Sequence, residues 1–322
     1  MDNEILISVN ELGRFYGQHQ AINNVSFNVH RGEILGFLGP NGAGKSTTMQ
    51  IISGVLAASH GSVTIAGQDI QTDGRTAKQH IGFLPEQPPL YTDLTVDEYL
   101  HYAAHLRNIN KSEINDAIKV SKIRCGLEDV GQRLIQNLSK GYKQRVGIAQ
   151  AIIHSPAVII LDEPTSGLDP IQIREIRELM RELGEDHSVI LSTHILSEVQ
   201  SLCDRVLIIN QGNIVLDQHL RELQQRGNNP QQLELGLRQA PAVDVLLAIA
   251  GVNAVEQTEQ GTLLLDLDPN TNVTNTLLEK SVQEQWGLYL LNPGDASLES
   301  IFMQLTYGEL QTNTETEAKP DA

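Results

Sequence analysis

One glycine-rich segment constrains the fold of this chain more than any other feature. Residues 39–46 match the pattern G-x-x-x-x-G-K-S of a phosphate-binding loop. The segment follows an apolar run at 33–38 and precedes a helical pattern at 45–53, so it joins a strand to a helix as this loop requires. Glycines let backbone N–H groups converge on an anion, and the helix N-terminus adds the positive end of its dipole. The sequence therefore predicts a nucleotide-phosphate site.

The residue types in this loop predict separate roles. Lys45 can reach the β- and γ-phosphates, Ser46 can offer its hydroxyl to Mg²⁺, and Thr47 can bond the α-phosphate. A chance match in a glycine-rich loop is the alternative, and the flanking strand and helix argue against it. The candidate nucleotide-binding residues here are Gly39, Pro40, Asn41, Gly42, Ala43, Gly44, Lys45, Ser46 and Thr47.

Apolar runs alternate with helical patterns over most of the chain. This alternation predicts an α/β domain with a parallel core sheet. Two shorter runs near the N-terminus, 25–29 and 63–65, predict an antiparallel β part. The predicted core strands lie at 33–38, 158–161, 188–192 and 205–209, with a helix at 171–183.

A helical insertion is predicted at about residues 92–137. Thr95 and Glu98 stand at the spacing of a capping box, which marks the start of a helix. Val96, Tyr99, Leu100 and Ala103 follow at helical spacing, and a second helix is predicted at 112–123.

Further motifs, in order along the chain, resemble those of ATP-binding cassette (ABC) ATPases. Residues 138–145, Leu-Ser-Lys-Gly-Tyr-Lys-Gln-Arg, resemble the signature motif of that family, and 158–164 resemble its Walker B strand. Residues 166–169 resemble its D-loop, which ends at Asp169. The resemblance covers about residues 5–223, and it also matches Tyr16 to the aromatic residue that stacks on adenine, Gln87 to the Q-loop glutamine and His194 to the switch histidine.

The candidate catalytic residues are Lys45, Glu163 and His194, and Asp162 is a candidate metal residue beside them. A carboxylate at Asp162 is costly to bury unless a cation pairs with it, so Asp162 can hold Mg²⁺ through water. Glu163 can orient and deprotonate the attacking water, and His194 can bond the γ-phosphate. The resemblance adds Gln87 as a metal contact and as the link to a membrane partner.

Ser139, Lys140 and Gly141 open a predicted helix and form a second candidate anion site. The resemblance implies that this site serves the nucleotide of another subunit, in a homodimer or with a paralogous ATPase, with two ATP molecules sandwiched between the subunits. The signature departs from the common family pattern, because Lys140 replaces a glycine and Tyr142 a glutamine. Lys140 either adds positive charge near the γ-phosphate or is solvated.

The C-terminal part has a different composition, which suggests a domain boundary. The chain carries a net charge of −17, and from Gln231 onward 14 residues are acidic and 3 basic. We predict an ABC ATPase domain at 1–225, a linker at 226–230, a small ferredoxin-like α+β domain at 231–308 with a regulatory or dimer-stabilising role, and a disordered tail at 309–322. The elements expected in the domain at 231–308 are strands at 233–237, 254–258, 262–267 and 287–291 and helices at 242–249, 273–285 and 297–305.

These features predict the ATP-hydrolysing subunit of an ABC transporter that acts on a separate integral-membrane permease. The resemblance is to ABC-2 type subunits, including those for gliding motility and multidrug export, and residues 297–306 resemble the short motif that ends many of them. No apolar stretch approaches a membrane span and no signal peptide is evident, so we expect a cytoplasmic protein peripheral on the inner face of the membrane. The alternatives are a cassette ATPase acting on DNA or ribosomes, which the acidic charge and the single cassette disfavour, and a non-catalytic nucleotide sensor.

Overall fold

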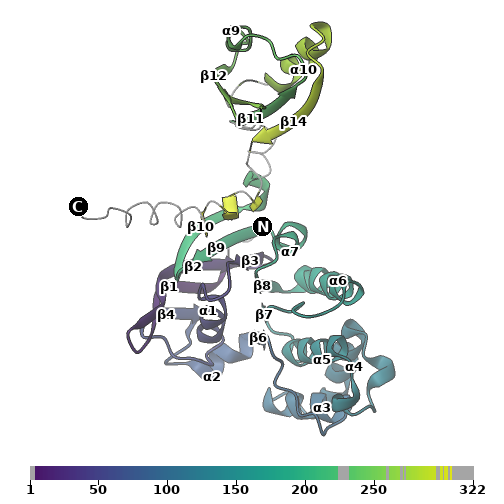
Figure 1. Ribbon diagram of the computed structural model, residues 1–322. Helices are drawn as coiled ribbons and strands as arrows, with labels where there is room; N and C mark the ends of the chain where they lie inside the picture. Colours follow the sequence, from purple (N-terminus) through teal and green to yellow (C-terminus); the bar gives the residue numbers. More distant parts are fainter. Residues whose placement is uncertain are drawn as a thin grey trace, which may run out of the picture. The chain divides into compact units, whose positions relative to one another are not determined.

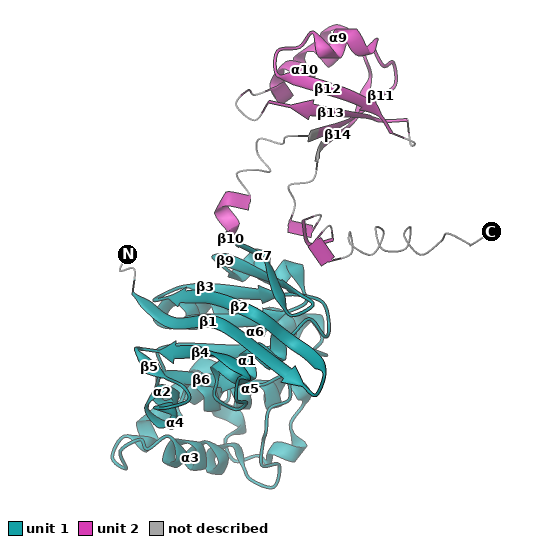
Figure 2. Ribbon diagram, turned by 90° about the vertical axis from the view of Figure 1, so that its left-hand side faces the viewer, with its two compact units in different colours: residues 1–218 teal, residues 219–322 magenta. Residues whose placement is uncertain are grey.

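The chain forms two compact units, residues 1–218 and 219–322 (Figure 2). The structure is a computed structural model and describes residues 4–223, 232–258, 261–268, 271, 273–294, 298–299, 301–303 and 305–306. The change of unit falls a few residues before the predicted linker. The predicted linker and tail lie outside the described residues, as does part of the closing helix expected at 297–305.

An antiparallel sheet forms one layer of the first unit. Its strand order is β2-β1-β4-β5, where β1 is Ile5–Tyr16, β2 is His19–His30, β4 is His60–Ile65 and β5 is Gln68–Asp69. The two short runs expected near the N-terminus are confirmed within β2 and β4. Strand β1 was not expected from the sequence, because polar residues interrupt its apolar pattern. Its pairing with β2 shifts register several times.

A six-stranded sheet forms the centre of this unit, with the order β10-β9-β3-β8-β7-β6. The pairs β9–β3, β3–β8, β8–β7 and β7–β6 are parallel, which confirms the predicted parallel core. Four of its strands were expected from the sequence, whereas the short β6 and the edge strand β10 were not. The bounds are β3 Ile34–Leu38, β6 Ile81–Leu84, β7 Val158–Asp162, β8 Ser188–Thr193, β9 Arg205–Asn210 and β10 Asn213–His219.

Apolar side chains cover both faces of this central sheet. In β7, Val158 and Ile160 pack into the core shared with the antiparallel sheet, whereas Ile159 and Leu161 pack into the core on the other face. Because both faces of the sheet are covered, neither face of these strands needs polar side chains. This explains why β7 and β8 appear in the sequence as continuous apolar runs. Helix α1 (Lys45–Ile52) lies on the first face, and α5 (Lys140–Ile152), α6 (Pro170–Asp186) and α7 (Leu196–Leu202) lie on the second (Figure 1).

The predicted helical insertion contains α3 (Val96–Leu106) and α4 (Ile114–Cys125), which pack against each other and against α5. The capping box is confirmed, because the Thr95 side chain accepts a bond from the Glu98 amide and Glu98 accepts one from the Thr95 amide. Two further short helices, α2 (Gly74–Ala77) and a 3₁₀ turn at Lys78–His80, precede β6. In the described part of the chain, no helix is both long and apolar enough to cross a membrane.

The second unit has the ferredoxin-like topology expected from its sequence. An antiparallel sheet with the order β12-β13-β11-β14 packs with two helices around a core that includes Trp286. Helix α9 is shorter than expected, and β12 begins two residues earlier. The bounds are β11 Gln232–Leu237, α9 Val243–Leu247, β12 Val252–Gln257, β13 Leu263–Leu267, α10 Val273–Gln283 and β14 Leu288–Gly294.

Candidate nucleotide site

The phosphate-binding loop lies between β3 and α1 in a form that only glycine permits at several positions. Gly42 and Gly44 have φ angles of +80° and +108°, which other residues rarely adopt. A Cβ at Gly39 would lie 2.4 Å from the Ile209 carbonyl oxygen, and one at Gly44 would lie 2.8 Å from the Ala21 oxygen. The loop is therefore packed against β9 and β2. The N-terminus of α1 lines a cavity through Lys45 and Ser46.

Lys45 lies buried at the start of α1. Its Nζ donates to the Gly39 oxygen at 2.8 Å and the Pro40 oxygen at 3.2 Å, and it lies 3.4 Å from Glu163 Oε1. Sheet order explains the last contact, because β3 and β7 both flank β8 and their carboxyl ends meet at one edge. The ammonium group is thus held where a phosphate on the loop would meet it.

Asp162 ends β7 beside the last residues of β8. It is 2% exposed, and its Oδ1 accepts a hydrogen bond from Ser192 Oγ at 2.7 Å. Burial raises the pKa of this carboxyl above its usual value, hydrogen bonds from Ser192 and Ser46 oppose that rise, and nearby Glu163 and Glu86 add to it. A cation at this position would favour the ionised form.

The oxygens of Asp162 and Ser46 suit Mg²⁺, which prefers oxygen ligands and keeps several waters. The described residues contain no cluster of three or more His, Cys, Asp or Glu side chains able to hold a metal. These two residues can therefore hold Mg²⁺ only in company with phosphate oxygens and water. Gln87 is exposed and is not among the residues that line the cavity, whereas its neighbour Glu86 is.

Glu163 and His194 contact each other beside the phosphate loop. Glu163 is buried, and its Oε2 lies 2.9 Å from His194 Nδ1. The Glu163 backbone has a φ of +48°, a left-handed conformation that costs roughly 1–3 kcal/mol for such a residue. Its amide donates to the Ser192 oxygen at 2.8 Å, which helps hold it there. Strain of this kind often marks functional positions.

A cavity of about 610 Å³ collects most of the predicted nucleotide residues. Tyr16 lies on its wall, 46% exposed, with the Arg14 guanidinium 4.8 Å from its ring centre. The size and lining suit a nucleotide. The sequence analysis did not assign His19, Ala21, Glu86 or Ser166 to the nucleotide site; Ser166 begins the D-loop segment, and Glu86 is next to Gln87. The lining residues are Tyr16, His19, Ala21, Asn41, Gly42, Gly44, Lys45, Ser46, Thr47, Glu86, Glu163, Ser166 and His194.

The start of α5 is not part of this cavity. Ser139 is its N-cap and accepts a bond from the Tyr142 amide at 3.4 Å, and Ser139 and Lys140 are exposed. The Lys140 ammonium lies over Gly167, at 2.2 Å from where a Cβ would stand, and Gly141 packs on Gln172. Asp169 caps α6, accepting bonds from the amides of Ile171 and Gln172. Within one copy, Lys140 therefore lies against the D-loop and Gly141 against α6, and neither they nor Ser139 line the phosphate-loop cavity.

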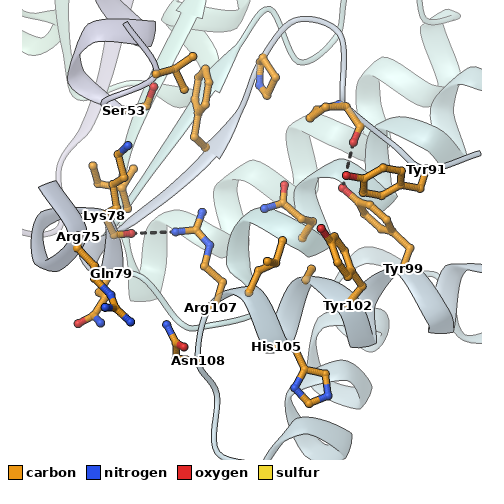
Figure 3. Close-up of a pocket in the computed structure, with 18 of the residues that line it drawn as sticks. Ser53, Arg75, Lys78, Gln79, Tyr91, Tyr99, Tyr102, His105, Arg107 and Asn108 are labelled. Carbon is orange, nitrogen blue, oxygen red and sulfur yellow. Dashed lines mark hydrogen bonds between the residues drawn. The ribbon is translucent and has the colours of Figure 1, made fainter. Parts of the chain in front are cut away.

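A second cavity, of about 950 Å³, lies in the same unit, between the segment around α2 and helix α3 (Figure 3). Its wall carries Tyr91, Tyr99 and Tyr102, with the Tyr91 and Tyr102 rings 5.4 Å apart and edge-on, and burial raises the pKa of Tyr99 to about 12. We call this cavity the tyrosine groove. Arg75, Lys78 and Arg107 are its cations, and no acidic residue is among the described residues that line it.

Comparison with known proteins agrees with this geometry. The family model described as ABC transporter matches residues 22–166. An uncharacterized ABC transporter ATP-binding protein of Bacillus subtilis, YxlF, is 31% identical over 94% of this chain and 100% of its own length. The linearmycin resistance ATP-binding protein LnrL of the same organism is 32% identical over 94% of this chain and 98% of its own.

The solved dimeric structure of MJ0796, a bacterial ABC transporter cassette, matches with a TM-score of 0.62 and 26% identity. It covers 67% of this chain and 99% of the cassette. The chain belongs to the ATP-binding subunits of ABC transporters, and it is an ATPase.

Proposed function

We propose that this chain drives an ABC-2 type exporter from the inner face of the plasma membrane. Two copies, or one copy and a paralogous ATPase, bind Mg²⁺-ATP between them and move a separate integral-membrane permease between states. Similarity over both units to LnrL, a protein named for linearmycin resistance, supports export. The acidic net charge of −17 supports a partner other than nucleic acid.

The residues of the nucleotide cavity divide the chemistry in this proposal. Lys45 and the loop amides hold the phosphate chain, and Tyr16 stacks on the base. Ser46 and Asp162 would hold Mg²⁺, which would neutralise charge on the phosphates. Glu163 accepts the proton of the attacking water, and His194, in contact with Glu163 at 2.9 Å, bonds the γ-phosphate.

One observation carries the dimer in this proposal: Lys45, Glu163 and His194 share one cavity, whereas Ser139 and Lys140 are exposed outside it. A hydroxyl and an exposed lysine at a helix N-terminus form a half-site for an anion. The nucleotide of a second copy fits that requirement, and MJ0796 is described as a dimer.

The dimer is tested with Glu163→Gln, which removes the proposed base and so preserves bound ATP. We expect this variant to elute as a dimer with Mg²⁺-ATP and as a monomer without nucleotide, by size-exclusion chromatography with light scattering. The same variant carrying Ser139→Ala should dimerise less at equal ATP. A monomer at saturating Mg²⁺-ATP would contradict the sandwich.

The tyrosine groove is the surface we assign to the permease. Pro85 and Pro89 line the groove, whereas Glu86, between them in sequence, lines the nucleotide cavity. One short segment thus touches both sites and can transmit movement, and it includes Gln87. Three tyrosines and three cations without an acid suit an amphipathic permease segment that carries acidic side chains.

Co-purification from membranes tests this assignment. We expect the tagged chain to recover an integral-membrane protein, and Tyr102→Ala with Arg107→Ala to lose it while basal ATP turnover of the isolated chain stays within about twofold, because neither residue lines the nucleotide cavity. Tyr289→Ala, an exposed tyrosine of the second unit, is the control. Equal recovery by the groove variant and this control would move the contact elsewhere.

A further inference from the structure

One buried carboxylate beside the nucleotide cavity has no role in the chemistry described above. Glu198 lies in the first turn of α7 and is 0% exposed. It does not line the cavity. Its charge is partly balanced by Arg177 of α6, whose Nη2 lies 3.5 Å from Glu198 Oε1.

The two oxygens of this carboxylate bind two different loops. Thr165 Oγ1 donates to Glu198 Oε1 at 2.5 Å, and Thr193 Oγ1 donates to Glu198 Oε2 at 2.9 Å. Thr165 belongs to the segment after β7, and Thr193 is the last residue of β8. Both threonines are buried, so water does not compete for their hydroxyls.

Each threonine lies next to residues of the nucleotide cavity. Thr165 lies between Glu163 and Ser166 in the sequence. The Ser166 amide there donates to the backbone carbonyl oxygen of Glu163 at 3.1 Å. Thr193 precedes His194, and its hydroxyl also accepts a bond from the Ile195 amide at 3.1 Å. The backbone on both sides of His194 is therefore tied to the same hydroxyl.

Stability alone is a poor explanation for this arrangement. Replacing a buried ionic group by packed apolar residues is often neutral or stabilising, so such groups are weak evidence for a purely stabilising role. The left-handed backbone of Glu163 gives a reason for a fixed support, because strained residues persist only where their surroundings over-determine them. Glu198 fixes the backbone two residues after Glu163.

We propose that Glu198 is a positioning residue that locks the Glu163–Ser166 segment to the His194 loop, so that both close on the γ-phosphate as one body. The proposal rests on the roles given above to Glu163 and His194. It assigns Glu198 no contact with nucleotide, and it predicts that the two threonine bonds act together on turnover and not on nucleotide affinity.

Matched threonine variants of the full chain test this proposal. Thr165→Val and Thr193→Val each remove one hydroxyl at nearly constant shape, whereas Thr165→Ser and Thr193→Ser keep it. We expect each valine variant to lower kcat about tenfold, since small misplacement of reacting groups is costly, with the ATP dissociation constant changed less than about twofold. The serine variants should stay within about threefold of wild-type kcat.

A control for structural effects exists in the second unit. Thr262 is buried and its Oγ1 donates to Glu234 Oε1 at 2.6 Å, so Thr262→Val removes the same kind of bond outside the cassette. It should lower the melting temperature without changing kcat. Rates are measured well below each variant's melting temperature, so that unfolding does not enter kcat.

The double variant Thr165→Val/Thr193→Val tests whether the two segments act as one unit or independently. If the loops act as one, the double variant loses about as much kcat as either single variant, because one broken bond already frees the pair. A loss equal to the product of the single effects, about a hundredfold, would overturn the proposal. Valine variants with wild-type kcat and only a lower melting temperature would also overturn it. Glu163→Gln in the same assay tests the base separately, because it removes the carboxylate and leaves both threonine bonds to Glu198 in place.

Discussion

The N-termini of helices α1 and α5 are both suited to bind phosphate, but the lysine at each N-terminus has different surroundings. At α1, Lys45 is buried and contacts two backbone oxygens and Glu163. At α5, Ser139 and Lys140 are exposed, and the first turn carries no acidic residue. A lysine without a nearby acid at the positive end of a helix dipole is unfavourable until an anion arrives. In our proposal the first site is therefore built within one copy, and the second takes its anion from another copy.

The N-terminus of helix α3, which lines no nucleotide cavity, has a different charge and cap. Its first turn carries Asp97 and Glu98, and Thr95 completes a capping box. The first turn of α3 thus carries its own negative charge, whereas the first turn of α5 carries none, which supports a ligand role for α5.

The strongest test of the α1 side removes its base. Glu163→Gln should lower ATP turnover by about 100-fold or more, because general base catalysis contributes at least that much, while ATP binding persists through Lys45 and the loop. Turnover is measured by phosphate release and binding by titration with a fluorescent nucleotide. Glu185→Gln, an exposed position on α6, is the control. A wild-type rate in Glu163→Gln would remove Glu163 from its assigned role.

The α5 side is tested by removing its hydroxyl. Ser139→Ala should lower turnover about tenfold and weaken ATP-dependent dimers, while nucleotide affinity of the isolated copy stays constant, because Ser139 is outside its own cavity. The same change also removes a helix cap, which costs about 1 kcal/mol of stability. Thr95→Ala removes the cap of α3 and controls for that cost. Equal losses of turnover in both variants would reduce the role of Ser139 to capping.

A smaller effect is expected from the charge of Asp162. Burial raises its folded-state pKa above the unfolded value, so ionising this carboxyl costs more in the fold than in the unfolded chain. The group therefore contributes stability below its unfolded pKa, and this contribution is lost as pH rises through the folded pKa. We expect Asp162→Asn to raise the melting temperature of the nucleotide-free, metal-free protein at pH 7 by about 2–4 °C.

The gain from Asp162→Asn should shrink as the pH falls toward the folded-state pKa, as followed by thermal scans at several pH values. Ser192→Ala, which removes a donor to the carboxylate, should lower the melting temperature at pH 7. A gain in Asp162→Asn that does not depend on pH would show that charge burial is not its cause.

Much of the cassette could be predicted from the sequence, where the signal is local. The strands at β3, β7, β8 and β9 are short buried apolar runs, and the phosphate loop is one continuous segment. The capping box of α3 is likewise local, since it spans the four residues from Thr95 to Glu98. The sequence did not indicate β1, whose register shifts break its pattern, or β6, which is four residues long.

What the sequence determined by itself is the loop at 39–46, because the conformation of a tight turn depends on consecutive residues and its glycines. Only the tertiary structure decided that Lys45 lies 3.4 Å from Glu163, that Glu86 rather than Gln87 lines the cavity, and that Glu198 joins two loops. These contacts depend on the order β3-β8-β7-β6, because the segments that follow these strands are far apart along the chain and meet at one edge of the sheet.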